Sequence, residues 1–300
     1  VYESRVLILV FLGMHPLLKK TPFYQDLPFI SNEYYEFNNA KPSLYFTPDE
    51  TEKGRILLNR MKVDLDKDEF VCIFARDDAY LKNLDPHINW DYHDARNTDI
   101  DRLIKTAKYL IERGFVVIRI GSIVNKPINF SHEKMIDYPY SGHRNEFLDI
   151  FLLAHCKLLI ASGISGICNV ANIFDTPLLE VNASEAIFIP FGKDCLYIPS
   201  KYKYSKTSDY LKFQDAIKLG SFWFDPAGFG LEKEESHTED IIEATQEMLA
   251  RLEGTFKYCP KTERLIQAYH ELWSKIGHTG SPNKTPIGIT WLKKNQDLYF

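Results

Sequence analysis

The stretch FVCIFARDDAY, residues 70–80, decides how this sequence folds. Its first six residues are apolar without interruption, which is typical of a strand that a parallel sheet buries on both faces. Polar residues begin abruptly at Arg76, where such a strand must end. Residues 70–75 therefore predict a central strand whose carboxyl end carries an arginine.

The same kind of strand recurs after intervening helices. Thr98 or Asp99 can cap a helix that runs to about Arg113, and Gly114 separates this helix from a second apolar strand at residues 115–120. Helices and strands then alternate over residues 146–155, 157–161, 165–174 and 177–181. Strand, helix and strand at this spacing form right-handed crossovers and a parallel sheet. The sequence therefore predicts an α/β protein with a Rossmann-like parallel sheet.

The two ends of the chain carry weaker signals. Residues 1–66 show no clear periodicity, and we expect a partial N-terminal region there, ahead of a main domain at residues 67–300. The sequence begins at Val1 rather than Met, from which we expect a fragment or a processed chain. The basic, tyrosine-rich stretch Lys201–Lys218 is predicted to be a surface segment.

Helices are predicted again toward the C-terminus. Ser236 and Glu239 have the spacing of a capping box, ahead of an amphipathic helix that runs to Leu252. Two further helices are expected at residues 262–276 and near Ile289.

Composition excludes several classes of protein. A net charge of −5 over 300 residues argues against a nucleic-acid-binding protein. The apolar stretch Val6–Leu18 is too short to span a bilayer and is interrupted by His15 and Pro16. We therefore expect a cytoplasmic protein, with peripheral contact to an inner membrane through Lys201–Lys218 as an alternative. Reduced thiols are expected from the odd and scattered set of five cysteines, Cys72, Cys156, Cys168, Cys195 and Cys259.

Candidate site residues follow the predicted strands. Ligands of open parallel sheets bind beyond the carboxyl ends of the strands, where Arg76 can fork onto a diphosphate. The alternative is a surface arginine paired with Asp77 or Asp78. Arg119 and Gly121 end the second strand and are expected at the same edge, and the loop at 122–145 can fold over a ligand.

The loop WDYHDARNTD, residues 90–99, is the second candidate. It leads into a helix N-terminus, which favours anions, so His93 and Arg96 can contact a phosphate or a sugar. The alternative is a network of helix caps. Asp99-Ile100-Asp101 also spells a DxD metal motif, but these acids lie in a first helical turn, where capping explains them. We expect no metal site, and the spacing of His132 and His143 does not predict one.

The turn ASGISG, residues 161–166, is the third candidate. Small residues ahead of a helix let backbone amides approach a phosphate or sugar hydroxyls. The turn matches neither the dinucleotide motif GxGxxG nor the Walker loop, and Ile167 breaks the lipase pattern GxSxG. The alternative is a tight strand-to-helix turn.

Several strings taken together resemble a known family, from about Leu44 to the C-terminus. They are CIFARDDAYL, DYHDARNTDI, FVVIRIGS, EFLDIFLLAHCKLLIASGISG, FDTPLLEVN and ITWLKKNQDL. These strings resemble a bacterial family of GT-B glycosyltransferases linked to surface-carbohydrate synthesis. The resemblance implies the donor lobe of a GT-B fold, with residues 1–66 as a reduced or truncated acceptor-side lobe.

A looser similarity links the sequence to the GT-B fucosyltransferases. Their arginine after the first strand of the donor lobe contacts the donor diphosphate, and Arg76 matches it. Their later acidic segment and Ser/Thr-rich turn match Glu146, Asp149 and residues 162–165. Ala75 stands where many of those enzymes carry a second arginine, so the resemblance does not specify GDP or fucose.

The resemblance implies an inverting, metal-independent sugar transfer from a nucleotide-diphosphate sugar to a glycan or lipid-linked acceptor, with no cofactor. The predicted catalytic residues are Arg76, which would stabilise the leaving group, and His93 or Asp77 as candidates for the base, although in GT-B enzymes the base often comes from the acceptor lobe. The predicted donor-binding residues, from the strand ends and loops and from the resemblance together, are Tyr80, Arg96, Asn97, Arg119, Gly121, Glu146, Asp149, Ser162, Gly163, Ser165 and Gly166. Two alternatives stay open: a nucleotide-sugar epimerase or related group transferase, and a non-catalytic sugar-nucleotide-binding scaffold.

Overall fold

A parallel sheet organises the protein, as seen in a computed structural model that describes residues 20, 42, 44–183, 192, 194–219, 225–276 and 285–300. The stretch Val6–Leu18 lies outside these residues. The sheet has six strands in the order β3-β2-β1-β4-β5-β6, which is the Rossmann order. The strands are β1 (Phe70–Ala75), β2 (Val116–Arg119), β3 (Met135–Asp137), β4 (Leu158–Ser162), β5 (Leu178–Ala183) and β6 (Cys195–Pro199). The predicted α/β fold with a parallel sheet is confirmed, and β3 and β6 are additions to it.

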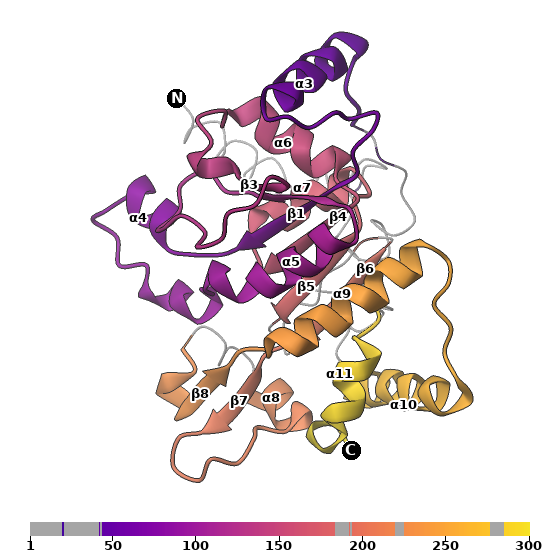
Figure 1. Ribbon diagram of the computed structural model, residues 1–300. Helices are drawn as coiled ribbons and strands as arrows, with labels where there is room; N and C mark the ends of the chain where they lie inside the picture. Colours follow the sequence, from indigo (N-terminus) through magenta and orange to yellow (C-terminus); the bar gives the residue numbers. More distant parts are fainter. Residues whose placement is uncertain are drawn as a thin grey trace.

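Helices cover both faces of the sheet (Figure 1). The α-helices are α3 (Pro48–Arg60), α4 (Ala79–Leu84), α5 (Ile104–Glu112), α6 (Glu146–His155), α7 (Gly166–Ile173), α8 (Phe213–Leu219), α9 (Thr238–Leu252), α10 (Pro260–Ile276) and α11 (Ile289–Lys294). Short 3-10 helices are η2 (Asp91–Arg96), η3 (Ile100–Leu103), η4 (Tyr138–Tyr140), η6 (Ala227–Phe229) and η7 (Gln296–Leu298). The predicted helix at 99–113 is thus η3 followed by α5, and the Asp99 carboxylate caps it by accepting the N–H of Asp101 at 3.0 Å.

The central strand β1 shows why both faces are covered. Val71 and Ile73 belong to one core cluster with residues of α5 and α9, which pack side by side on that face. Phe70 and Cys72 belong to the other cluster, with residues of α6 and α7. All six residues of β1 are buried, as an uninterrupted apolar strand requires.

The described part of the first 66 residues packs onto this domain. Thr47 and Glu50 form a capping box that begins α3. Gly54 of α3 lies against the ring of Phe151 in α6, so close that a Cβ atom on Gly54 would overlap the ring. The helix therefore covers the α6 face of the sheet. The division of the chain at residue 66 stays a prediction.

One local prediction is incomplete and another is wrong. Much of Lys201–Lys218 is exposed, as predicted, but β7 (Lys201–Tyr204) also pairs antiparallel with β8 (Leu231–Glu234) and leads to α8, around a small core of its own. The capping box at Ser236 does not form. Its N–H donates to Asn182 Oδ1 at 2.7 Å and its hydroxyl to the Pro199 carbonyl at 3.3 Å, so tertiary bonds take the groups that a cap would use. The helix itself begins after His237.

None of the helices in the described part of the chain is long and apolar enough to cross a membrane.

Candidate functional site

The ends of β1 and β4 meet at the point where the strand order reverses. Ala75 and Ser162 are register partners, and the Arg76 N–H donates to the Ser162 carbonyl at 3.0 Å. The Thr98 N–H in turn donates to the Arg76 carbonyl at 2.9 Å. The ladder therefore continues one residue beyond β1 and draws the loop at 90–99 onto the edge of the sheet. This switch point is where open parallel sheets bind their ligands.

A glycine allows that loop to lie so close. Gly163 follows β4 with a φ of +79°, a backbone conformation that favours glycine. A Cβ atom on Gly163 would overlap the carbonyl oxygen of Arg96. Gly163 therefore brings Arg96 against the β4 turn by having no side chain, and it does not itself line the pocket described next.

A pocket of about 540 Å³ opens on the α7 side of this edge. It brings together nine of the predicted site residues: Arg76, Asp77, Tyr80, His93, Arg96, Gly121, Asp149, Ser165 and Gly166. Apolar side chains, among them Phe74, Leu81 and Val170, form part of its wall. Its size is that of an ordinary small-molecule site.

Arg76 is the most buried cation of the pocket, with 6% of the residue exposed. Its Nη1 donates to the His93 carbonyl at 3.1 Å and to the side-chain oxygen of Asn97. Burial lowers the pKa of Arg76 from its ordinary value. No carboxylate within the described ranges forms an ion pair with it. The guanidinium is therefore fixed in place by neutral acceptors.

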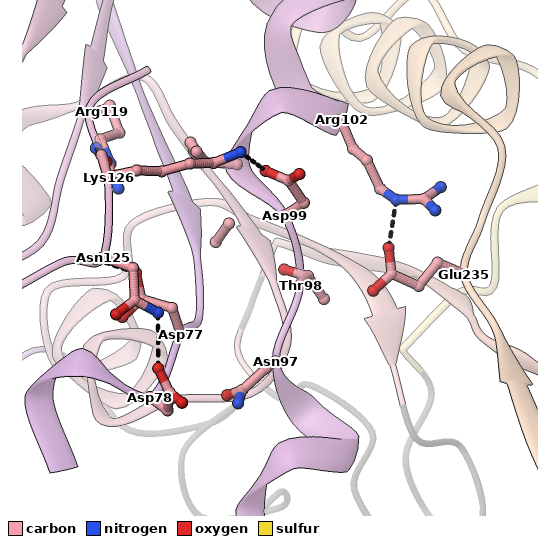
Figure 2. A pocket seen from close by; sticks show the side chains of 12 residues that line it. Asp77, Asp78, Asn97, Thr98, Asp99, Arg102, Arg119, Asn125, Lys126 and Glu235 are labelled. Carbon is pink, nitrogen blue, oxygen red and sulfur yellow. Dashed lines mark hydrogen bonds and ion pairs between the residues drawn. The ribbon is translucent and has the colours of Figure 1, made fainter. Parts of the chain in front are cut away.

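The two aspartates that follow Arg76 are occupied elsewhere, so the predicted alternative of a surface ion pair is wrong. Asp77 accepts the N–H groups of Ala79 at 3.1 Å and Asn125 at 3.0 Å. Asp78 pairs with Lys82 at 2.5 Å and accepts from the Asn125 side chain at 2.7 Å (Figure 2). Both carboxylates thus tie the loop after β1 to the loop after β2. A role for Asp77 as a base stays a prediction and would require it to give up these bonds.

His93 and Arg96 form a unit beside Arg76. The Arg96 guanidinium contacts His93 Nδ1. Burial first, and then the charge of Arg76, lower the pKa of Arg96 to about 10. Burial, with the charges of Arg96 and Arg76, lowers the pKa of His93 to about 4. His93 is therefore neutral near pH 7 and takes up a proton only weakly, which suits an acceptor for Arg96 better than a catalytic base.

The start of α7 supplies neutral donors to the same pocket. Ser165 is the N-cap residue, and its hydroxyl makes no capping bond to the helix. Ser165, Gly166 and Ile167 all line the pocket. The first amides of a helix have no partner within the helix and favour an anion. The N-terminus of α7 thus lines the same cavity as Arg76 and Arg96.

Five predicted site residues lie outside this pocket. Ser162 is buried and its hydroxyl accepts from Asn182 Nδ2 at 2.8 Å, while Glu146 is exposed in the first turn of α6. Gly163 acts through its close approach to Arg96. Asn97 and Arg119 line a second pocket, of about 470 Å³, between β1, β2 and η3. Arg119 is 1% exposed and forms an ion pair with Asp137 at 3.0 Å, so it stabilises the pairing of β2 with β3.

Asp99 of the DxD sequence lines this second pocket, and both of its aspartates pair with Lys126. Lys126 Nζ lies 2.7 Å from Asp99 Oδ1 and 2.7 Å from Asp101 Oδ2, and Figure 2 shows its ammonium turned toward Asp99. The ammonium offsets one of the two negative charges of this pair. Over the described residues, no three His, Cys, Asp or Glu side chains are grouped to hold a metal ion.

Two residues at or near the first pocket, Arg144 and Lys233, were not among the predicted site residues. Arg144 lines it and pairs with Asp149 at 2.6 Å, and its place just ahead of α6 is a signal that the sequence offered. Lys233 of β8 donates to the Ala95 carbonyl at 2.8 Å across 138 residues. No spacing in the sequence could reveal that contact.

Comparisons with known proteins give little beyond this geometry. No protein-family model and no curated protein matches the chain. E. coli ADP-heptose LPS heptosyltransferase II is similar in structure, with a TM-score of 0.42 and 15% sequence identity, over 71% of this chain and 55% of that one. The chain thus spans about half the length of that enzyme.

Proposed function

We propose that this chain binds a nucleotide-diphosphate sugar in the pocket beside Arg76 and transfers the sugar to a glycan or lipid-linked acceptor. The observation that carries the proposal is the arrangement of Arg76, Arg96 and the start of α7 around one cavity at the switch point of the sheet. Arg76 is buried there and held by neutral acceptors, so its charge remains available to an anion. The resemblance to GT-B glycosyltransferases supports the same reading.

The chemistry requires such a site. In the transfer, the acceptor oxygen attacks the anomeric carbon, and the bond from that carbon to the β-phosphate oxygen breaks. The electron pair of this bond leaves with the diphosphate, while the acceptor proton goes to a base. Donors that are already in place stabilise the growing charge without reorganising. Arg76 suits this role because the His93 carbonyl and Asn97 fix the plane of its guanidinium. A guanidinium held in this way can bind a phosphate through two parallel hydrogen bonds.

The surroundings strengthen this electrostatic effect. Phe74, Ile167 and Val170 give the pocket an apolar wall. A charge–charge contact is stronger next to apolar groups than in water. We therefore propose that Arg76 and Arg96 stabilise the leaving group and that the amides near Ser165 contact the same diphosphate.

We further propose that the reaction needs no divalent metal and that the base comes from the acceptor side. Lys126 already supplies a positive charge to Asp99 and Asp101. His93 holds a proton too weakly to be an efficient base, and both oxygens of Asp77 accept backbone N–H groups. The catalytic base would then come from another protein segment, or from a residue that reaches the site only when the sugar acceptor is bound.

Calorimetric titration tests the donor assignment. GDP, UDP, ADP, CMP and dTDP are titrated into the purified chain, with magnesium and with EDTA. One nucleoside diphosphate should bind, with a dissociation constant that EDTA leaves unchanged. Binding of none of them contradicts the proposal. Incubating the chain with the matching nucleotide sugar and an acceptor then distinguishes transfer from interconversion of the sugar and from binding alone.

A further inference from the structure

Lys233 connects the small two-stranded sheet to the turn that carries His93 and Arg96. Its Nζ donates to the Ala95 carbonyl, one residue before Arg96, at 2.8 Å. The Lys233 side chain is 13% exposed. This is a buried cation that the proposed chemistry has not used, and it holds the main chain of η2 directly.

Among the described residues, the ammonium of Lys233 has one long ion pair, to Glu235. Glu235 lies 4.0 Å away, but Arg102 Nε holds that carboxylate at 2.6 Å. Glu234, the next residue, pairs with Lys201 at 2.6 Å and with Lys203. The open pocket around Lys233 is lined by charged groups of both signs, namely Arg102, Lys203, Glu232, Glu234, Glu235 and His237.

Two nearby positive charges make the protonated form of Lys233 less favourable. Burial lowers the pKa of Lys233 to about 8, Glu235 raises it, and the positive charges of Arg102 and Arg76 lower it further. An anion bound beside Arg76 would offset one of these opposing charges. The protonated form of Lys233 would then become more favourable in the complex than in the free protein.

We propose that Lys233 is a positioning residue for the diphosphate: its side chain donates to the Ala95 carbonyl and fixes the turn that presents Arg96, and its neutral amine takes up a proton when an anion fills the pocket. This inference rests on the proposed function, since the anion is the diphosphate of the nucleotide. Two consequences follow by linkage. Nucleotide affinity should fall as the pH rises through about 8, because the free protein then loses the proton. Near that pH, binding should be accompanied by proton uptake.

The test uses three variants and the nucleoside diphosphate that the titration above identifies. Affinity is measured across the pH range, and proton uptake is measured by calorimetry in two buffers with different ionisation enthalpies. Lys233→Met removes the charge and the bond to Ala95. Lys233→Arg keeps a charge that does not titrate in this range. Lys201→Met is the matched control, because Lys201 is similarly buried in the same two-stranded sheet but pairs within it, with Glu234.

The wild-type protein should take up at most about half a proton per nucleotide at pH 8, where free Lys233 is already about half protonated, and a larger fraction above that pH. Lys233→Met should bind on the order of tenfold more weakly without proton uptake, as expected for loss of a charged hydrogen bond. Lys233→Arg should regain affinity without regaining the uptake. Lys201→Met should match the wild type in both. Thermal unfolding of each variant identifies any loss of fold.

The outcomes separate the two proposals. If the wild type binds no nucleoside diphosphate at any pH, the proposed function fails and this inference fails with it. If the wild type binds but folded Lys233→Met or Lys233→Arg shows the same proton uptake, only the inference is overturned. Equal losses of affinity in Lys233→Met and Lys201→Met also overturn it, because they point to the stability of the small sheet alone.

Discussion

Gly163 and Arg96 are packed so closely that a single methyl group on the glycine would overlap the arginine's carbonyl oxygen. The contact joins the turn after β4 to the loop after β1. Through it, the position of one cationic wall of the pocket depends on a residue that contributes no side chain.

Gly163→Ala should therefore lower both stability and nucleotide binding. Gly114→Ala is the control, because Gly114 also has a positive φ, +98°, but open space around its missing Cβ. Backbone strain alone should cost the control about 1–2 kcal/mol. Overpacking should add about 1–3 kcal/mol in Gly163→Ala. Urea unfolding measures the loss of stability in each variant, and calorimetry measures nucleotide binding. Equal losses of stability in the two variants would show that the contact with Arg96 is unimportant.

Arg76 should determine affinity for the diphosphate and contribute nothing to affinity for the unphosphorylated nucleoside. Arg76→Ala and Arg76→Lys should each weaken nucleoside-diphosphate binding by about tenfold to a hundredfold, since a hydrogen bond to a charged group contributes about 1.5–3 kcal/mol. Lysine should not restore the affinity, because it lacks the planar pair of donors. Calorimetry with the nucleotide and its nucleoside measures both effects. Arg113→Ala, which removes an exposed ion pair with Glu253, should bind like the wild type; an unchanged dissociation constant in Arg76→Ala would falsify the phosphate assignment.

Glu180 should make the protein less stable at alkaline pH. Its side chain is fully buried in β5, and neither carboxyl oxygen has a hydrogen-bond partner among the described residues. Burial raises the pKa of Glu180 to about 8, from an ordinary value of 4.5. The folded state therefore holds this proton more tightly than the unfolded chain, so stability is greatest below the unfolded value and is lost as the pH rises through about 8.

Glu180→Gln removes the ionising group while keeping the shape of the side chain. In the wild type, the free energy of unfolding should fall by a few kcal/mol between about pH 5 and about pH 9. The variant should not show this fall. Glu69→Gln, a change at an exposed carboxylate, is the control. Urea unfolding across this range provides the measurement. A decline that persists unchanged in Glu180→Gln would assign it to other groups.

Cys259 should be the fastest thiol to react with iodoacetamide. It is the exposed one of the five free cysteines; the other four are buried. Hydrogen bonds from Thr262, together with the backbone N–H of Lys261, lower the pKa of Cys259 to about 7, whereas burial raises the pKa of Cys168 to about 12. Since the thiolate is the reactive form, Cys259→Ser should abolish the fast phase of alkylation and Thr262→Val should slow it at neutral pH. Mass spectrometry of the labelled peptides identifies the site, and early labelling at Cys168 would contradict the assignment.

The sequence predicts the elements around β1 and β4 well because each is a continuous apolar run or a helix with one apolar face. It also predicts the position of Arg76, since the carboxyl ends of parallel strands share an edge whatever the surrounding detail. Arg119 shows where this reasoning stops. It too ends a strand, but its partner Asp137 lies in β3, a three-residue strand with no apolar pattern of its own to reveal it.

The remaining parts of the site depend on contacts between distant segments. Lys233 reaches Ala95 across 138 residues, and Ser236 bonds to Asn182 across 54. Local preferences favour a surface lysine and a helix cap at these positions. Tertiary structure overrides both, because buried polar groups must find partners wherever the fold provides them.

The hydrogen bonds that join Ser162, Arg76 and Thr98 at the end of the sheet include an unbroken series of main-chain groups. Replacing the side chains at Arg76 or Thr98 leaves these amides and carbonyls in place. The main-chain part of this junction therefore does not depend on those side chains, although the Arg76 side chain adds bonds to the His93 carbonyl and to Asn97. Replacements of the side chains at Arg76 and Thr98 should therefore change the chemistry at this edge more than the path of the main chain around it.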